Sequence, residues 1–219
     1  MKQKFVFLQA VVAATVSLAF AAPAQAGGDA AAGKTKAAMC IGCHGIPGYQ
    51  SSFPEIHKVP KIAGQSEPYL AAALTAYRKG ERKHPTMRGI AGSLGEQDIA
   101  DLAAFYAGLN PGVKAPAELK PAPPTVAALL QKGACVACHG ANLSQPIDPS
   151  YPKIAGQHPD YLYVALKSYT IEGNSHVGRA NPIMGGMARQ FQPAELKELA
   201  RFVGGLDGEL ATVPQARFR

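Results

Sequence analysis

The sequence predicts an all-α protein of two tandem domains that are copies of one unit. The first observation is a duplication, in which three segments of the first half return 92 to 97 residues later. The second is helical periodicity in both copies, with no alternation of period two long enough for a strand. The third is a proline-rich stretch between the copies, which is typical of a linker.

The repeated segments define how the two copies align. They are "CIGCHG" (40–45) and "CVACHG" (135–140), "PKIAGQ" (60–65 and 152–157), and "LGEQDIADLAAFYAGL" (94–109) and "FQPAELKELARFVGGL" (191–206). A repeat of more than 90 residues is a duplicated domain rather than a solenoid unit. The stretch between the copies, "NPGVKAPAELKPAPP", holds five prolines and almost no apolar periodicity.

Each copy predicts three helices. The first runs from about Asp29 to Met39, with its counterpart from about Thr125 to Lys132. The second begins after Ser66, its N-cap, and carries apolar and aromatic residues at helical spacing. The third has the clearest apolar stripe, formed in the two copies by Ile99, Leu102, Ala103, Tyr106 and Leu109, and by Leu196, Leu199, Ala200, Val203 and Leu206.

The first 26 residues have the pattern of a secretory signal. Lys2 and Lys4 precede an apolar run, and Ala24-Gln25-Ala26 has the small-x-small form of a cleavage site. We therefore expect export to the periplasm and cleavage after Ala26. A retained membrane anchor is the alternative, but the cleavage site is well formed and no later stretch is apolar for long enough to span a bilayer.

Removal of residues 1–26 leaves a first domain at 27–109, a linker at 110–124 and a second domain with a basic C-terminal tail at 125–219. Lys+Arg falls from 22 to 20 while Asp+Glu stays at 15, so the net charge is about +5. This charge suits an acidic protein partner or peripheral association with a membrane surface. The basic residues are scattered and form no stripe with aromatics between them, which argues against nucleic acid.

The cysteines point to a cofactor rather than to disulfides. Export would usually predict two disulfides from four cysteines. However, both pairs are Cys-x-x-Cys followed at once by His, the attachment signature of a c-type haem. The predicted thioether anchors and iron ligands are Cys40, Cys43 and His44 in the first copy, and Cys135, Cys138 and His139 in the second. A buried haem would also supply apolar contact that a small core lacks. Export and the adjacent histidines argue against the alternative of zinc or thiol–disulfide chemistry.

A second axial ligand is needed for each iron. Electron carriers usually use methionine, whose soft thioether favours the reduced iron. The duplication selects Met87 and Met184, because each lies seven residues before the last repeated segment and two residues after a proline. Met39 and Met187 have no methionine counterpart, and Met187 stays as an alternative ligand of the second iron.

The other histidines are most simply surface or loop residues. They are His57, His84, His158 and His176. Ligation of iron by two histidines, through His84 or His176, stays open as an alternative to the methionines.

These motifs together resemble the dihaem cytochrome c4 family, in which two class I cytochrome c domains, each wrapped around one covalently bound haem, lie in tandem. The resemblance covers essentially all of the mature chain. It implies that the carbonyl oxygens of Pro60 and Pro152 accept hydrogen bonds from Nδ1–H of the ligating histidines, which would orient the imidazoles. It also makes four residues candidates for hydrogen bonds near the haem propionates: Gln65, Gln157, Tyr69 and Tyr161.

One position departs from this resemblance. Gly33 lies where class I cytochromes c let the first and last helices cross closely, but the second copy has Ala128 near that place. We therefore expect a looser helix contact in the second domain.

The resemblance implies an electron-transfer protein rather than an enzyme. It would carry single electrons from a quinol-oxidising complex to a terminal oxidase at the membrane face, with redox proteins as partners and no small-molecule substrate. The alternative is a cytochrome subunit that accepts electrons from a dedicated dehydrogenase, such as a flavoprotein. A dihaem peroxidase or thiosulfate-oxidising enzyme is disfavoured, because such chemistry generally wants an open or exchangeable iron position and both copies offer a methionine.

Overall fold

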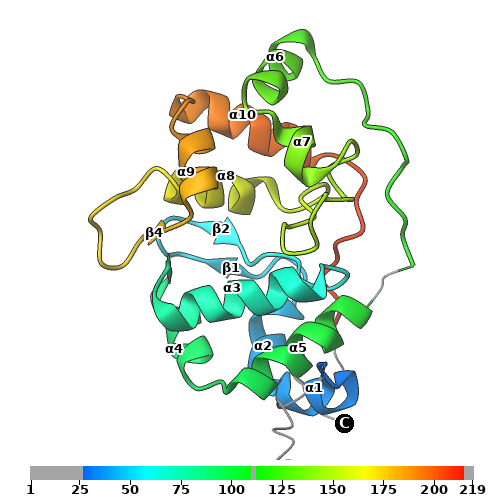
Figure 1. The fold of residues 1–219 in the computed structure, drawn as a ribbon, viewed down its shortest axis with the longest axis vertical. Helices are drawn as coiled ribbons and strands as arrows, with labels where there is room; N and C mark the ends of the chain where they lie inside the picture. The colour runs from blue at the N-terminus through cyan, green and yellow to red at the C-terminus, as the bar shows by residue number, and fades with distance from the viewer. Residues whose placement is uncertain (1–26, 110–111, 215–219) are drawn as a thin grey trace, which may run out of the picture.

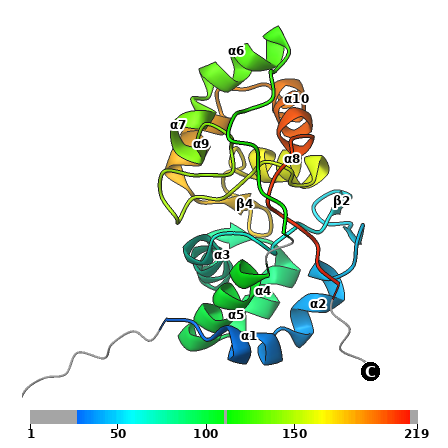
Figure 2. The ribbon, with the colours of Figure 1, turned by 90° about the vertical axis from the view of Figure 1, so that its right-hand side faces the viewer.

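The computed structural model describes residues 27–109 and 112–214, so the predicted signal segment and the last residues of the basic tail lie outside the described residues. The chain forms two helical domains stacked along the long axis of the molecule (Figures 1 and 2). Each domain has its own cluster of buried apolar residues. The predicted arrangement of two helical domains is therefore confirmed.

The helices of the two domains follow the same order, whereas the pair of strands β1 and β2 has no counterpart in the described part of the second domain. The first domain contains α1 (Ala30–Lys36), α2 (Ala38–His44), β1 (Gln50–Ser51), β2 (His57–Lys58), α3 (Glu67–Lys79), β3 (Arg82–Lys83), α4 (Pro85–Gly92) and α5 (Glu96–Gly108). The second contains α6 (Pro124–Lys132), α7 (Cys135–His139), α8 (Pro159–Ser168), β4 (Gly178–Arg179), α9 (Pro182–Ala188) and α10 (Pro193–Gly204).

The structure differs from the predicted helices in their ends and in the short elements. The first predicted helix is divided at Ala37 into α1 and α2, and the second helix of the later copy ends at Ser168. Ser66 occupies the N-cap position of α3 but makes no side-chain cap bond, because its hydroxyl donates to the carbonyl of Pro149 in the other domain. The two-residue strands are too short to leave a periodic signal.

The close crossing of α1 and α5 centres on Gly33. A β-carbon added there would lie 2.0 Å from the carbonyl oxygen of Asp101, so only glycine allows this contact. The backbone N–H of Asp29 and the ammonium of Lys36 both donate to the Asp101 carboxylate, at 2.8 and 2.5 Å. The hydrogen bond from Lys36, with those from Asp29 and Gln97, lowers the pKa of Asp101 to about 2.

The corresponding contact in the second domain is looser, as expected from Ala128. There α6 meets the core through Val126, Leu129 and Leu130, and its backbone approaches α10 over a smaller contact than α1 makes with α5. Figure 1 shows α6 standing at the far end of this domain.

The described part of the linker and the segment after α10 both run between the domains. From Gly112 the chain runs alongside the molecule up to α6 (Figure 1). The amide of Asn142 donates to the carbonyl of Pro116 at 2.9 Å, and Leu119 packs on the core of the second domain. After α10, the chain returns to the first domain, where Ala211 pairs with Ala63. Nowhere in residues 27–109 or 112–214 is a helix long and apolar enough to cross a membrane.

Candidate haem sites and the seam between the domains

One continuous cavity of about 610 Å³ extends through both domains. Its wall brings together the residues that the duplicated motifs selected, which are Cys40, Cys43, His44 and Met87 from the first domain, and Cys135, Cys138, His139 and Met184 from the second. The i, i+3, i+4 spacing within α2 and α7 puts both thiols and the imidazole of each motif on one helix face. None of the four cysteines is in a disulfide.

The two motif histidines are held in the same way. Nδ1 of His44 lies 2.9 Å from the carbonyl oxygen of Pro60, and Nδ1 of His139 lies 2.9 Å from that of Pro152. Burial lowers the pKa of both imidazoles, and the bond to the carbonyl opposes that shift. With Nδ1–H donating, Nε2 keeps its lone pair for a metal.

Met87 and Met184 occupy equivalent places. Each is the third residue of a short helix that begins with proline, α4 or α9. The backbone N–H of Met87 donates to Nδ1 of His84 at 3.4 Å, and that of Met184 donates to Oδ1 of Asn181 at 2.9 Å. Met187 also lines the cavity, but Nε2 of Gln190 lies 3.7 Å from its sulfur.

Two of the remaining histidines have clear structural roles. Both ring nitrogens of His84 are engaged, because Nδ1 caps α4 and Nε2 lies 3.2 Å from the carbonyl oxygen of Phe53. The prediction of a surface or loop position is wrong for His57, which belongs to β2 and is 4% exposed. Its ring lies 6.2 Å from that of Tyr161 in the other domain. The exposed His176 lines a separate groove beside α4.

Gln65 and Gln157 connect the two domains. Gln65 Nε2 donates to the carbonyl of Lys153 at 2.9 Å, and the Lys153 N–H donates back to Oε1 at 3.0 Å. Gln157 makes the mirror pair with Lys61, at 2.8 and 2.9 Å. Both buried amide groups therefore have backbone partners across the seam, where the two "PKIAGQ" loops face each other, and both residues also line the cavity. Their place near the haem propionates, which the resemblance implied, stays a prediction.

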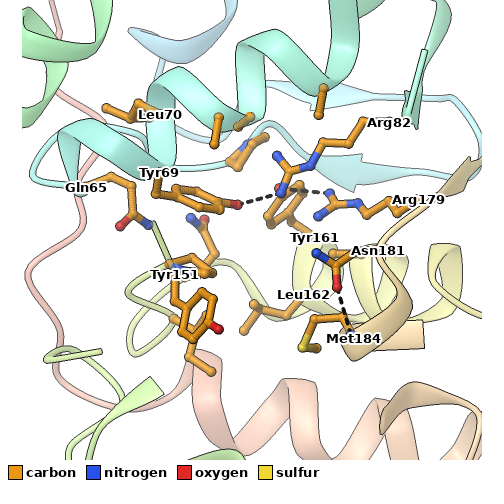
Figure 3. A pocket seen from close by; sticks show the side chains of 18 of the residues that line it. Gln65, Tyr69, Leu70, Arg82, Tyr151, Tyr161, Leu162, Arg179, Asn181 and Met184 are labelled. Atoms are coloured by element: carbon orange, nitrogen blue, oxygen red, sulfur yellow. Dashed lines mark hydrogen bonds between the residues drawn. The ribbon is translucent and has the colours of Figure 1, made fainter. Parts of the chain in front are cut away.

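The tyrosines at the starts of α3 and α8 lie beside two arginines (Figure 3). A guanidinium nitrogen of Arg82 donates to the hydroxyl of Tyr69 at 2.9 Å, and one of Arg179 donates to that of Tyr161 at 3.0 Å. Sequence reasoning did not select either arginine. A signal was present, however, since each lies five residues before the methionine of its own copy, Met87 or Met184.

The cavity wall fits the chemistry of two haems, one in each domain. Most of it is apolar, as a macrocycle requires, and each half supplies thiols, an imidazole and a thioether. A haem also carries propionate carboxylates. The described wall offers four cations, Lys61, Arg82, Lys153 and Arg179, against the single acidic side chain of Glu81.

The fold and these sites define a protein of two tandem c-type haem domains. The family model described as cytochrome c matches residues 30–110 and again 125–207. Cytochrome c4 of Azotobacter vinelandii is 32% identical over 212 residues, which cover 90% of this chain and 99% of that protein. The thiosulfate dehydrogenase electron acceptor of Thiomonas intermedia is 30% identical over 206 residues, 88% of each chain.

A solved structure agrees. The crystal structure of reduced recombinant cytochrome c4 from Pseudomonas stutzeri matches with a TM-score of 0.59 at 29% identity, over 82% of this chain and 99% of that one. The chain belongs to the cytochrome c4 family. It is therefore an electron-carrying dihaem cytochrome with two covalently bound haem c groups, as the sequence motifs predicted.

Proposed function

We propose that this protein carries single electrons from a quinol-oxidising complex to a terminal oxidase at the membrane face. The observation that supports this most is the pair of possible iron ligands in each domain. Each pair consists of a motif histidine and a methionine from a short helix, and both residues line the cavity. An iron held by both of these donors would have no position left for a substrate. The haem, when bound, supplies a reversible one-electron change at its iron.

We assign roles to the chain's own residues on the same basis. Thioether anchorage falls to Cys40, Cys43, Cys135 and Cys138, and axial ligation to His44, Met87, His139 and Met184. The carbonyls of Pro60 and Pro152 hold the imidazoles in one tautomer and one orientation. A ligand set that does not change with redox state needs little reorganisation, which favours fast transfer.

We further propose that the protein reaches the periplasm through cleavage of residues 1–26, and that its units are residues 27–109 and 125–219 joined by the linker 110–124. The pattern of the first residues supports the first part. The separate apolar clusters support the second.

A second candidate function is that of a cytochrome subunit serving one dehydrogenase. A specific observation favours it, since a relative that matches over most of both chains is named as the electron acceptor of thiosulfate dehydrogenase. The residues of the haem sites would be the same in both cases. The two candidate functions differ only in the redox protein that exchanges electrons with this one.

Electron transfer with membrane vesicles tests the proposal. Quinol and membranes together are expected to reduce the oxidised protein, and an inhibitor of the quinol-oxidising complex should block this. Air should then reoxidise the protein through the membranes in a cyanide-sensitive step. Absorbance of the haems follows both steps, and membranes alone set the background. Failure with quinol, together with reduction by a co-purifying dehydrogenase and its substrate, would support the subunit role instead.

A further inference from the structure

A groove beside α4 is lined by residues of both domains and is separate from the haem cavity. It has a volume of about 450 Å³ and shares no lining residue with the cavity of the candidate haem sites. A β-carbon added at Gly89 or Gly92 would meet nothing within 4 Å, so the groove is open along α4. The ionisable side chains that line it are all basic, namely Lys83, His84, Arg88 and His176.

The elements of the first domain present one face to this groove and the other to the haem cavity. In α4, Arg88 lines the groove one turn after His84, whereas Met87 lines the cavity. In β3, Lys83 lines the groove whereas Arg82 lines the cavity, as the alternation of a strand requires. A group bound in the groove would therefore lie behind the helix that carries Met87.

The loop that precedes β4 is held against Lys83. This loop projects on the side of the molecule where α4 lies (Figure 1). The ammonium of Lys83 donates to the carbonyl of Asn174 at 2.5 Å, and β3 pairs with β4. The side chain of Asn174 accepts hydrogen bonds from the N–H groups of His176 and Val177, at 2.8 and 2.9 Å. The second domain's part of the groove is therefore fixed beside the ammonium.

The two permanent cations of the groove have no carboxylate partner. Within residues 27–109 and 112–214, neither Lys83 nor Arg88 forms a salt bridge. The acidic residues closest to the groove in sequence are placed elsewhere, since Glu172 pairs with Arg189 at 2.7 Å and Glu81 lines the haem cavity. Positive charge gathered in a groove without acidic groups favours an anion.

The histidines of the groove differ in what they can donate. The ring of His84 is fully engaged, because Nδ1 accepts from the N–H of Met87 and Nε2 faces the carbonyl of Phe53 at 3.2 Å. Burial lowers the pKa of His84, which keeps this ring neutral. The side chains of Ser175 and His176 are exposed and form no hydrogen bond within the described residues. These two are free to donate to a ligand.

We propose that Lys83, Arg88, Ser175 and His176 bind a phosphate group, and that the bound group lowers the midpoint potential of the first-domain haem. A phosphate group carries about two negative charges near pH 7, and its oxygens accept hydrogen bonds from several sides. Lysine and arginine are the side chains that usually bind it. Negative charge near an iron stabilises the ferric state. The redox part rests on the proposed haem sites, whereas the binding part does not.

Titration of the reduced, ¹⁵N-labelled haem protein with sodium phosphate tests the site, with sodium chloride keeping the ionic strength constant. The amide signals of Gly89, Ser175 and His176 are expected to shift and to saturate. Lys83→Gln and Arg88→Gln should each weaken binding by about tenfold or more, the factor that loss of a charged hydrogen bond implies. Shifts that do not saturate, or that chloride alone reproduces, would overturn the site.

Two further variants make this result specific. Lys79→Gln is the matched control, because it removes a positive charge from the last turn of α3 without lining the groove. It should leave the affinity unchanged, and weakening equal to that in Lys83→Gln would refute the site in favour of a general charge effect. Lys83→Arg keeps the charge and should bind phosphate within a few-fold of the unsubstituted protein. Loss of binding in this variant would contradict the role of the charge.

Other anions identify the ligand more closely. Glycerol phosphate presents the same group on a small organic molecule. Tighter binding than that of inorganic phosphate would assign the site to an organic phosphate, and weaker binding would assign it to the free ion. Acetate that binds as tightly as phosphate would overturn the phosphate assignment.

Redox titration tests the second part of the proposal. The methyl proton signal of each axial methionine, assigned with methionine variants, reports the two haems separately. Saturating phosphate should lower the first-domain potential more than the second, and Arg88→Gln should remove this difference. By linkage, the oxidised protein must bind phosphate more tightly than the reduced one, by a factor of ten for each shift of about 59 mV. Saturable binding with unchanged potentials would refute the redox part alone, whereas absence of the methionine signals would refute the haem ligands.

Discussion

Met87→Ala is expected to remove the thioether-to-iron absorption of one haem, and Met184→Ala that of the other, each reducing the band at the red edge of the oxidised spectrum by about half. Both methionines lie in the first turn of a short helix on the cavity wall, and both have their N–H groups fixed by a capping side chain. Alanine has no side-chain atom that can bind iron, so the coordination position of the methionine would be filled by water or stay empty. The potential of the affected haem should fall, because the soft thioether favours ferrous iron.

Two control variants make this result specific. Met187→Ala should leave both bands, since the sulfur of Met187 lies beside Gln190 and its counterpart in the first copy is Ile90. His84→Asn should also leave both, because it converts the cap of α4 into the kind of cap that Asn181 gives α9. Loss of a band in Met187→Ala, with Met184→Ala unaffected, would reassign the second iron. Loss of a low-spin haem signal in His84→Asn alone would favour ligation of that iron by two histidines.

Duplication made much of each site predictable from the sequence. A Cys-x-x-Cys-His motif places two thiols and an imidazole within five residues of one helix. Comparison of the two copies then removed most of the ambiguity about which methionines would bind iron. The contacts of the motif histidines with the carbonyls of Pro60 and Pro152 were implied by the family resemblance, and the repeated "PKIAGQ" segments put them at equivalent places in the two copies. These features depend on short stretches of chain, which local patterns describe well.

The short helices α4 and α9 were harder to predict. Their sequences, "PTMRGIAG" and "PIMGGMA", are rich in glycine and therefore poor in helix propensity. Proline at the first position and a capping side chain hold them instead. Seven or eight residues are also too few for a helical period to stand out in the sequence.

The seam between the domains could not be predicted, because a repeat does not say which faces of its copies meet. Gln65 and Gln157 were expected near the haem propionates, and nothing in the sequence indicated that they also form hydrogen bonds across the seam with the opposite loop. His57 gave no sign of burial. Arg82 and Arg179 were visible only as a repeated spacing to methionine, and their pairing appears only when β3 and β4 come together.

Gly33→Ala is expected to destabilise the first domain by about 1–3 kcal/mol, the usual cost of overpacking a tight contact. The added β-carbon would meet the Asp101 carbonyl oxygen at 2.0 Å and the β-carbon of Phe105 at 2.7 Å. Both neighbours belong to the middle of α5 and cannot turn aside, so α1 must move away. That movement would also stretch the bonds from Asp29 and Lys36 to the Asp101 carboxylate.

Denaturant unfolding, followed by the haem absorption of the first domain, measures this effect. Gly108→Ala is the matched control, because it makes the same change at the end of α5, where an added β-carbon has nothing within 4 Å. In Gly108→Ala the denaturant concentration at the midpoint of unfolding should be unchanged or slightly higher, since alanine restricts the unfolded chain more than glycine does. The second domain should unfold as before in both variants, because α6 meets α10 through side chains and Ala128 already occupies the corresponding place. Equal stability of Gly33→Ala and Gly108→Ala would show that α1 can shift freely on α5, and that the close crossing is not what holds the first domain together.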